Sequence, residues 1–171
     1  SGVVNTINLS KIDTANISFF VHGGTTVINA ITERKGVKTA LITTLGFRDI
    51  LGIMRGNRPD MYNLKPKKPT PFVERKLRFE VKERVTSEGK ILTPLNLESL
   101  DEIIDICKKN KVESIAIQFM HSYLFTENEK KCEEYIKKRF PEVSITISSD
   151  ITREWREFER ANTAVLNAYV Q

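Results

Sequence analysis

The sequence contains two histidines, His22 and His121, which occupy matching places. Each follows a short apolar run that is typical of a buried strand, residues 17–21 and 115–120, and each precedes a polar turn. Parallel sheets bind ligands beyond the carboxyl ends of their strands, so both imidazoles would face one cleft if the two strands share such a sheet. Neutral imidazole can ligate a metal or transfer a proton near pH 7. The alternative is that each histidine only closes its strand end through a backbone hydrogen bond.

The segment Gly23-Gly24-Thr25-Thr26 follows the first histidine at the predicted start of a helix. Free backbone amides and the helix dipole favour negative charge at such a place, and glycine lets the backbone approach a phosphate or carboxylate closely. These residues are therefore candidates for phosphate or substrate binding. The alternative is that the two threonines only form the N-cap of the helix.

Arginines follow the next predicted strand, residues 39–44. Arg48, Arg55 and Arg58 could each bind a carboxylate or phosphate through two parallel hydrogen bonds, and the alternative is solvated loop charge. The charged run from Arg153 to Arg160 is interpreted as an exposed, ion-paired helix. The pattern ties no serine or cysteine to either histidine, so we predict no catalytic triad.

A sheet is needed to bring these residues together, and the chain predicts an α/β protein. A helix with the apolar residues of 27–31 facing inward is predicted between the strands at 17–21 and 39–44, which suggests a parallel βαβ unit. Four prolines between residues 55 and 76 preclude a helix there and predict a long Pro/Lys-rich loop. Residues 77–85 alternate between apolar and charged side chains, which predicts a half-exposed strand that returns as a hairpin through a turn at 87–90.

The rest of the chain shows clearer periodicity. Its pattern predicts a helix after a cap at Asn96, a buried strand at 115–120, a helix with a capping box at Thr126 and Glu129, an edge strand at 143–147 and a charged helix from 152 to 169. Residues 1–171 are predicted to form a single domain.

Composition limits the class of protein. The 171 residues are 40% hydrophobic and 29% charged, as in globular proteins, and the formal charge of +5 is spread along the chain without a nucleic-acid-binding motif. No apolar stretch approaches the roughly 20 residues that cross a bilayer, so we predict neither a nucleic-acid nor a membrane partner. Cys107 and Cys132 form no C-x-x-C pattern, and Cys107 lies on an apolar stripe, so a reduced, cytoplasmic setting is expected.

Six blocks are spread along nearly the whole sequence: residues 22–30 (H-G-G-T-T-x-x-N-A), 43–49 (T-T-x-G-F-R-D), 58–62 (R-P-D-x-Y), 78–85 (R-F-E-V-x-E-R-V), 119–123 (F-M-H-S-Y) and 156–170 (R-E-x-E-R to N-A-Y-V). In type and order they resemble the N-terminal region of the hydantoinase A/oxoprolinase family. That family includes ATP-dependent N-methylhydantoinases and oxoprolinases, and related subunits of acetone and acetophenone carboxylases.

The resemblance implies a ribonuclease-H-like lobe, as in the actin, sugar kinase and Hsp70 ATPases. It also implies an enzyme that phosphorylates an unreactive amide or ketone oxygen with ATP and Mg before hydrolysis or carboxylation. Hydantoin, oxoproline and a ketone remain alternative substrates, and whether another metal binds stays open. On this basis His22 and His121 are the candidate catalytic residues. The candidate contacts to substrate or phosphate are Gly23, Gly24, Thr25, Thr26, Asn29, Arg48 and Arg58.

Two features of the family are missing from the sequence: an acidic D-x-G-G-T-x-T-D phosphate loop, and a larger domain with a second phosphate loop after the N-A-Y-V block. We therefore expect an internal fragment, inactive alone and without tight ATP binding. The remaining domains of the same protein and a second subunit would complete an enzyme acting on a cyclic amide. Such a fragment exposes an apolar face, which favours homo-oligomers. The alternative is a ligand-binding or subunit-docking module of a related carboxylase, with loop 55–76 as its contact surface.

Overall fold

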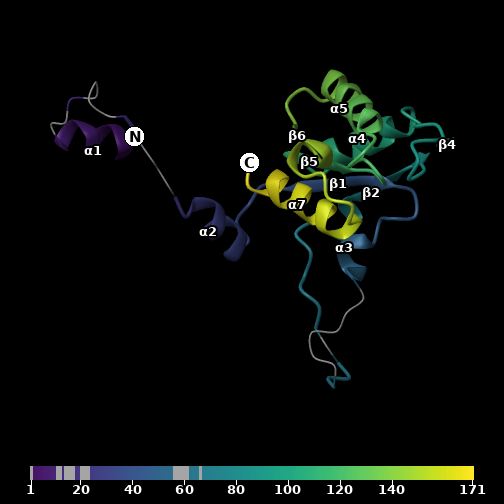
Figure 1. Ribbon diagram of the computed structural model, residues 1–171, viewed down its shortest axis with the longest axis horizontal. Helices are drawn as coiled ribbons and strands as arrows, with labels where there is room; N and C mark the ends of the chain where they lie inside the picture. Colours follow the sequence, from purple (N-terminus) through teal and green to yellow (C-terminus); the bar gives the residue numbers. More distant parts are fainter. Residues whose placement is uncertain (1, 11–12, 14–17, 20–23, 56–61, 66) are drawn as a thin grey trace.

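A four-stranded sheet in the order β2-β1-β5-β6 forms the centre of the computed structural model, which describes residues 2–10, 13, 18–19, 24–55, 62–65 and 67–171 (Figure 1). Its strands are β1 (Thr39–Thr44), β2 (Arg78–Val81), β5 (Ser114–Gln118) and β6 (Ser144–Ile147). All neighbouring strands are parallel, so their carboxyl ends lie at one edge of the sheet. The predicted α/β class with a parallel sheet is confirmed.

Helices cover both faces of this sheet. Figure 1 shows α4 (Ser99–Lys109) and α5 (Glu127–Arg139) on one face and α7 (Glu157–Tyr169) on the other. Every residue of β1 and β5 is buried as a result, and three consecutive residues of each strand, 40–42 and 115–117, are apolar. The stripe predicted for α4 faces this core, and its Cys107 is completely buried.

The chain order β5-α5-β6 forms a parallel βαβ unit, and β6 is the edge strand, as predicted. A short helix, α6 (Ser148–Ile151), follows β6 directly. The prediction of one continuous helix over 152–169 is wrong, because residues 152–156 are not helical and α7 begins at Glu157. The carbonyl of Glu154 accepts a hydrogen bond from the Arg160 guanidinium instead of a helical amide.

The predicted hairpin is present, but the strand that leads into it is divided. A single 3₁₀ turn, η2 (Arg75–Leu77), precedes β2, which joins the main sheet. After two residues outside any strand, β3 (Arg84–Val85) pairs antiparallel with β4 (Ile91–Thr93). The alternation predicted for 77–85 is wrong at Arg78, which is buried because its guanidinium donates two hydrogen bonds to the Val73 carbonyl.

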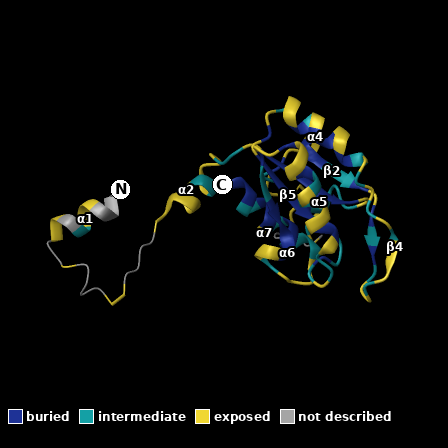
Figure 2. Ribbon diagram, turned by 90° about the horizontal axis from the view of Figure 1, so that it is seen from above, coloured by how far each residue is buried: buried dark blue, intermediate teal, exposed yellow. Residues whose placement is uncertain are grey.

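The first helices, α1 (Gly2–Ser10) and α2 (Thr26–Thr32), lie outside the sheet-and-helix body (Figure 2). The strand predicted at 17–21 falls mostly outside the described residues, and its described member Phe19 is exposed and not in a strand. Both sides of β1 are occupied, by β2 and β5. The inward face predicted for residues 27–31 is wrong as well, since Val27 and Ile28 are exposed.

The long loop predicted at 55–76 follows α3 (Ile50–Ile53). Its described residues from 62 to 74 belong to no helix or strand, and Figure 1 shows the segment extending away from the body. Within the described part of the chain, no helix combines the length and the apolar character that crossing a membrane requires.

Candidate functional site at the carboxyl edge of the sheet

The turn after β5, residues 119–122, lies at the carboxyl edge of the sheet and is held by side chains from three other elements. Its first amide donates to Glu129 of α5 (3.0 Å), and its second donates to Thr44 at the end of β1 (2.9 Å). Its third amide donates to Glu157 of α7 (3.3 Å). The backbone amides that follow the end of β5 thus donate hydrogen bonds to side chains, because buried polar groups need partners.

The carbonyl of Phe119 is bound as closely as these amides. It accepts hydrogen bonds from Arg160 Nη2 (2.9 Å), from Ser122 Oγ (2.8 Å) and from Gln118 Nε2 (3.0 Å). The Glu157 carboxylate in turn accepts from the side chains of Arg160 and Gln118. One carbonyl and one carboxylate therefore fix the turn to α7.

Arg160 is completely buried, which requires that each part of its guanidinium finds a partner. Besides Glu157 and the Phe119 carbonyl, it donates to the Glu154 carbonyl (2.7 Å) and to Ser148 Oγ (3.3 Å). The interpretation of 153–160 as an exposed, ion-paired helix is therefore wrong at its last residue.

Glu129 has a different role from the predicted one. A capping box would place its carboxylate at the start of α5, and Thr126 makes no side-chain cap. Glu129 is instead completely buried and accepts from Ser148 Oγ (2.6 Å) and the Ser149 amide (2.9 Å), in addition to the turn. The Glu129 carboxylate therefore serves the Phe119 amide of the turn and the Ser149 amide of α6, both far from it in sequence, and not the start of α5.

A third carboxylate, the buried Glu83, connects the same edge to the hairpin. It accepts from Thr44 Oγ1 and from Asn128 Nδ2 (2.8 Å). Burial raises the pKa of Glu83, although the hydrogen bonds from Thr44 and Asn128 oppose the rise. Burial likewise raises the pKa of Glu157, against the charge of Arg160.

His121 is the third residue of this turn. Its φ of 58° lies in the left-handed region, which is uncommon for a residue other than glycine. Its Nδ1 is buried and has no hydrogen-bond partner among the described residues, and its ring meets the ring of Tyr123 edge-on at 6.1 Å. Burial lowers the pKa of His121, and the charges of Arg84 and Arg160 lower it further. The imidazole is therefore neutral near pH 7 and able to accept a proton.

The glycine- and threonine-rich segment is not brought to this edge. His22 and Gly23 lie outside the described residues, so a cleft shared by the two histidines remains a prediction. Gly24, Thr25 and Thr26 stand at the start of α2, which leads into the beginning of β1, whereas His121 follows the end of the parallel strand β5. These are opposite ends of the sheet.

The described part of this segment does not fit a phosphate cradle. A Cβ on Gly24 would meet nothing closer than Thr26 Oγ1 at 3.9 Å, so no close backbone approach requires glycine there. Thr25 precedes α2 without a side-chain cap. The exposed Asn29 uses its backbone: its amide donates to the Thr25 carbonyl, and its carbonyl accepts from the Glu33 amide and the Thr32 hydroxyl. Residues 24–29 thus form no close-packed glycine loop in this structure, and their binding of phosphate or substrate stays a prediction.

The arginines after β1 make contacts within the chain. Asp49 is bound through both oxygens by Arg75 (2.9 Å each), and Arg48 donates to the Arg75 carbonyl (3.2 Å) while its Nε is buried without a partner in the described structure. Arg55 pairs with Glu159. Arg58 lies outside the described residues.

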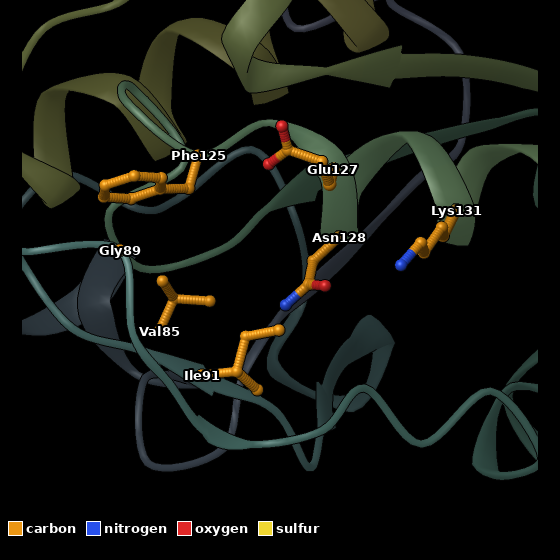
Figure 3. A pocket seen from close by; sticks show the side chains of 7 residues that line it. All are labelled: Val85, Gly89, Ile91, Phe125, Glu127, Asn128 and Lys131. Carbon is orange, nitrogen blue, oxygen red and sulfur yellow. The ribbon is translucent and has the colours of Figure 1, made fainter.

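A small cavity of about 190 Å³ adjoins the site between the hairpin and the start of α5 (Figure 3). In Figure 3 Asn128 points toward Ile91, while Glu127 points away from it. The residues that line the cavity are Val85, Gly89, Ile91, Phe125, Glu127, Asn128 and Lys131. Asn128 connects this cavity to the 119–122 turn through Glu83 and Thr44. No cluster of three or more His, Cys, Asp or Glu side chains suited to a metal ion occurs in the described parts of the chain.

Sequence reasoning missed Glu83, Glu129, Glu157 and Arg160 as residues that build the site. The sequence does contain one signal for Arg160. It lies one helical turn before Ala164 and two turns before Ala168, on the face of small residues that packs on the sheet. An arginine on such a face is buried, and the glutamate three residues before it is its natural partner.

Comparison with known proteins places the chain. The model of the hydantoinase/oxoprolinase N-terminal region matches residues 1–140. An uncharacterized protein of Methanocaldococcus jannaschii is 40% identical over 173 residues, which cover 99% of this chain and 25% of that protein. The caprolactamase subunit alpha of Pseudomonas jessenii is 28% identical over 158 residues, covering 91% of this chain and 23% of the subunit.

The fold agrees with the sequence match. The crystal structure of the ATP-dependent caprolactamase from Pseudomonas jessenii superposes with a TM-score of 0.83 at 27% identity, over 98% of this chain and 25% of that one. The chain thus spans about a quarter of the length of the relatives it matches. A family model that covers most of the chain, together with this superposition, shows that the chain belongs to the hydantoinase/oxoprolinase family, as its N-terminal region.

Proposed function

We propose that these 171 residues are part of the first lobe of an ATP-dependent enzyme that activates a cyclic amide carbonyl by phosphorylation and then hydrolyses the ring. The observation that carries the proposal is the superposition of nearly the whole chain on an ATP-dependent caprolactamase. The family model over residues 1–140 supports the same class of reaction.

Within this function we assign His121 the part of a proton acceptor beside the substrate. Three features support the assignment: its position after a strand at the carboxyl edge of a parallel sheet, its lowered pKa, and the turn that is fixed on three sides around it. His22 stays the second candidate, from sequence alone.

The nucleotide is proposed to bind mainly through other parts of a longer polypeptide. The described residues at Gly24–Thr26 do not form a phosphate cradle, and the arginines Arg48 and Arg75 are engaged within the chain. A second subunit is the proposed partner, since one relative is itself named as a subunit. ATP and Mg would then be requirements of the assembled enzyme.

A substrate panel tests this function on the full polypeptide with its co-expressed subunit. 5-Oxoproline, hydantoin, caprolactam and a ketone with bicarbonate are each incubated with Mg-ATP, and ADP and ring-opened product are quantified. We expect ADP formation that depends on a cyclic amide and a matching amount of amino acid product. ADP release that depends only on the ketone would place the chain in a carboxylase, and no substrate-dependent ADP with any compound would contradict the proposal.

The role of His121 is tested by His121→Asn in the same assay. Asparagine tolerates positive φ better than most residues, so the turn should keep its shape while the imidazole is lost. We expect kcat to fall at least about 100-fold, the usual range for a lost general base. Unchanged turnover would remove His121 from the chemistry and leave the rest of the proposal standing.

A further inference from the structure

We propose that Glu157, together with Arg160, is a positioning residue for His121, and that it holds the imidazole in the one backbone conformation in which it meets the substrate. The catalytic half of this inference rests on the proposed function, and the structural half does not. The geometry behind it centres on the contact between α7 and the 119–122 turn.

The first observation is that Glu157 contacts the backbone of His121 itself. Its Oε1 accepts the His121 amide at 3.3 Å, and that residue has a φ of 58°. A residue with a Cβ avoids this conformation unless neighbouring contacts enforce it. The hydrogen bond to the amide is a contact that enforces it.

The second observation is that Glu157 cannot move independently. Its other oxygen accepts from Arg160 and from Gln118, and both of those side chains also donate to the Phe119 carbonyl. Arg160 is completely buried, and its remaining nitrogens bind the Glu154 carbonyl and Ser148. The Arg160 and Gln118 side chains therefore hold Oε2 of Glu157 in place, and this orients Oε1 toward the His121 amide.

The third observation concerns the far side of the turn. The carbonyl of His121 accepts from the amides of Leu124 and Phe125, each at 3.1 Å. The peptide groups on both sides of the His121 Cα are thus fixed, one by Glu157 and the other by the following turn. With both fixed, the direction of the Cα–Cβ bond, from which the imidazole extends, follows.

A role limited to stability would not require this contact to reach His121. Glu159, two residues along α7, is also a carboxylate paired with an arginine, Arg55, and it makes no contact with the 119–122 turn. Glu157 and Glu159 therefore form a matched pair on one helix, of which one is predicted to act on His121 and the other not.

The test is a double-mutant cycle on the full polypeptide, measured as substrate-dependent ADP formation. Glu157→Ala should lower kcat about tenfold or more with KM changed less than about twofold, because the imidazole is misplaced while substrate binding is kept. Added to His121→Asn, the same substitution should lower kcat no further, since Glu157 acts through His121. Glu159→Ala should leave both constants near wild type.

A further drop of the double variant below His121→Asn would show that Glu157 acts otherwise and would overturn the proposal. Because Glu157→Ala leaves the Arg160 charge without its carboxylate, the cycle is repeated with Glu157→Leu/Arg160→Met, which removes both charges together. This second variant should reproduce the loss of kcat and the non-additivity. Full activity in a folded Glu157→Leu/Arg160→Met protein would overturn the proposal as well.

Amide hydrogen exchange on the 171-residue chain separates this inference from the proposed function. Loss of the Glu157 acceptor should speed exchange of the His121 amide about tenfold or more relative to the Met120 amide, which Thr44 holds independently. Glu159→Ala should not change that ratio. An unchanged His121 amide in Glu157→Ala overturns the inference whatever the enzyme assay shows, and absence of turnover in wild type contradicts only the proposed function.

Discussion

At the scale of single residues, Arg160 carries more of the site than any residue that the sequence singled out. It is a completely buried cation with a buried carboxylate beside it and three further acceptors around it. Replacing Arg160 by methionine leaves Glu157 without its charge partner and the Phe119 carbonyl without one donor. Breaking a buried pair on one side costs about 3–5 kcal/mol.

We therefore predict that Arg160→Met lowers the free energy of unfolding by about 3–5 kcal/mol in urea titrations of the chain. Arg156→Met, on an exposed residue whose guanidinium lies over the Trp155 ring at 5.2 Å, should stay within about 0.5 kcal/mol of wild type. Equal effects of the two substitutions would mean that the buried pair contributes no more than a surface arginine.

The buried carboxyl of Glu83 makes stability depend on pH in a direction that can be stated. Burial raises its pKa in the folded chain above the ordinary 4.5, so the folded state holds the proton longer than the unfolded state. The contribution of Glu83 to stability is therefore largest below pH 4.5 and is lost as pH rises through the raised pKa. Glu157 contributes with the same sign.

Glu83→Gln should accordingly reduce the loss of stability between pH 4.5 and neutral pH, measured by urea unfolding at several pH values. Asp49→Asn is the contrasting control. The hydrogen bond from Arg75 lowers the pKa of Asp49, so its contribution is present above pH 3.8 and lost as the solution is made more acidic. In the plot of unfolding free energy against pH, Glu83→Gln should thus change the side toward neutral pH and Asp49→Asn the acidic side. Identical plots for the two variants would contradict the assigned directions of the pKa shifts.

At the scale of elements, the segment between α2 and β1 touches the end of α7. Gly36 packs so closely against Tyr169 that a Cβ would overlap both its carbonyl and its ring, and the Val37 amide donates to the same carbonyl at 2.9 Å. This contact ties the start of the central strand to the last turn of the helix that carries Glu157.

Gly36→Ala should destabilise the chain by about 1–3 kcal/mol, because neither the carbonyl nor the ring can move away without disturbing α7. Gly24→Ala, where the nearest atom would be 3.9 Å away, should be neutral within about 0.5 kcal/mol. Thermal unfolding of the two alanine variants compares them directly. A neutral Gly36→Ala would mean that the end of α7 is not held against β1.

How far the sequence predicted these elements depends on what positions each of them. β1, β5 and α4 were predicted nearly to their ends. A strand buried on both faces leaves a short apolar run in the sequence, and a helix buried along one stripe leaves a helical period. Glu129 was misread because a local capping pattern and a long-range contact to the turn ask for the same residue type. The break before α7 was missed for a related reason: the Glu154 carbonyl serves Arg160, and no local pattern records that contact.

Of the candidate site residues, the sequence identified His121 through its place after a buried strand, which needs only strand periodicity and a parallel sheet. It did not identify the residues that hold the turn. These come from β1, from the segment between β2 and β3, from α5 and from α7, and they meet only in the folded chain. Gly24, Thr25 and Thr26 match a family signature, yet the fold places them at the other end of the sheet from His121. The order of the motifs along the sequence does not reveal that these residues and His121 lie at opposite ends of the sheet.

At the scale of the whole molecule, the chain has a covered parallel sheet and a preformed turn at its carboxyl edge, but its described residues offer no cradle for a nucleotide. Two of its relatives are about four times as long, since this chain spans 25% and 23% of them. Both facts support the central claim, that these residues supply one part of an ATP-dependent site which other parts of a longer polypeptide complete.

Calorimetric titration with Mg-ATP, on the 171-residue chain and on the full polypeptide side by side, tests that claim most directly. The account predicts stoichiometric binding by the full polypeptide and no measurable heat of binding for the chain by itself. Stoichiometric, tight binding of Mg-ATP by the chain by itself would contradict the account and would make Gly23-Gly24-Thr25-Thr26 a complete phosphate site.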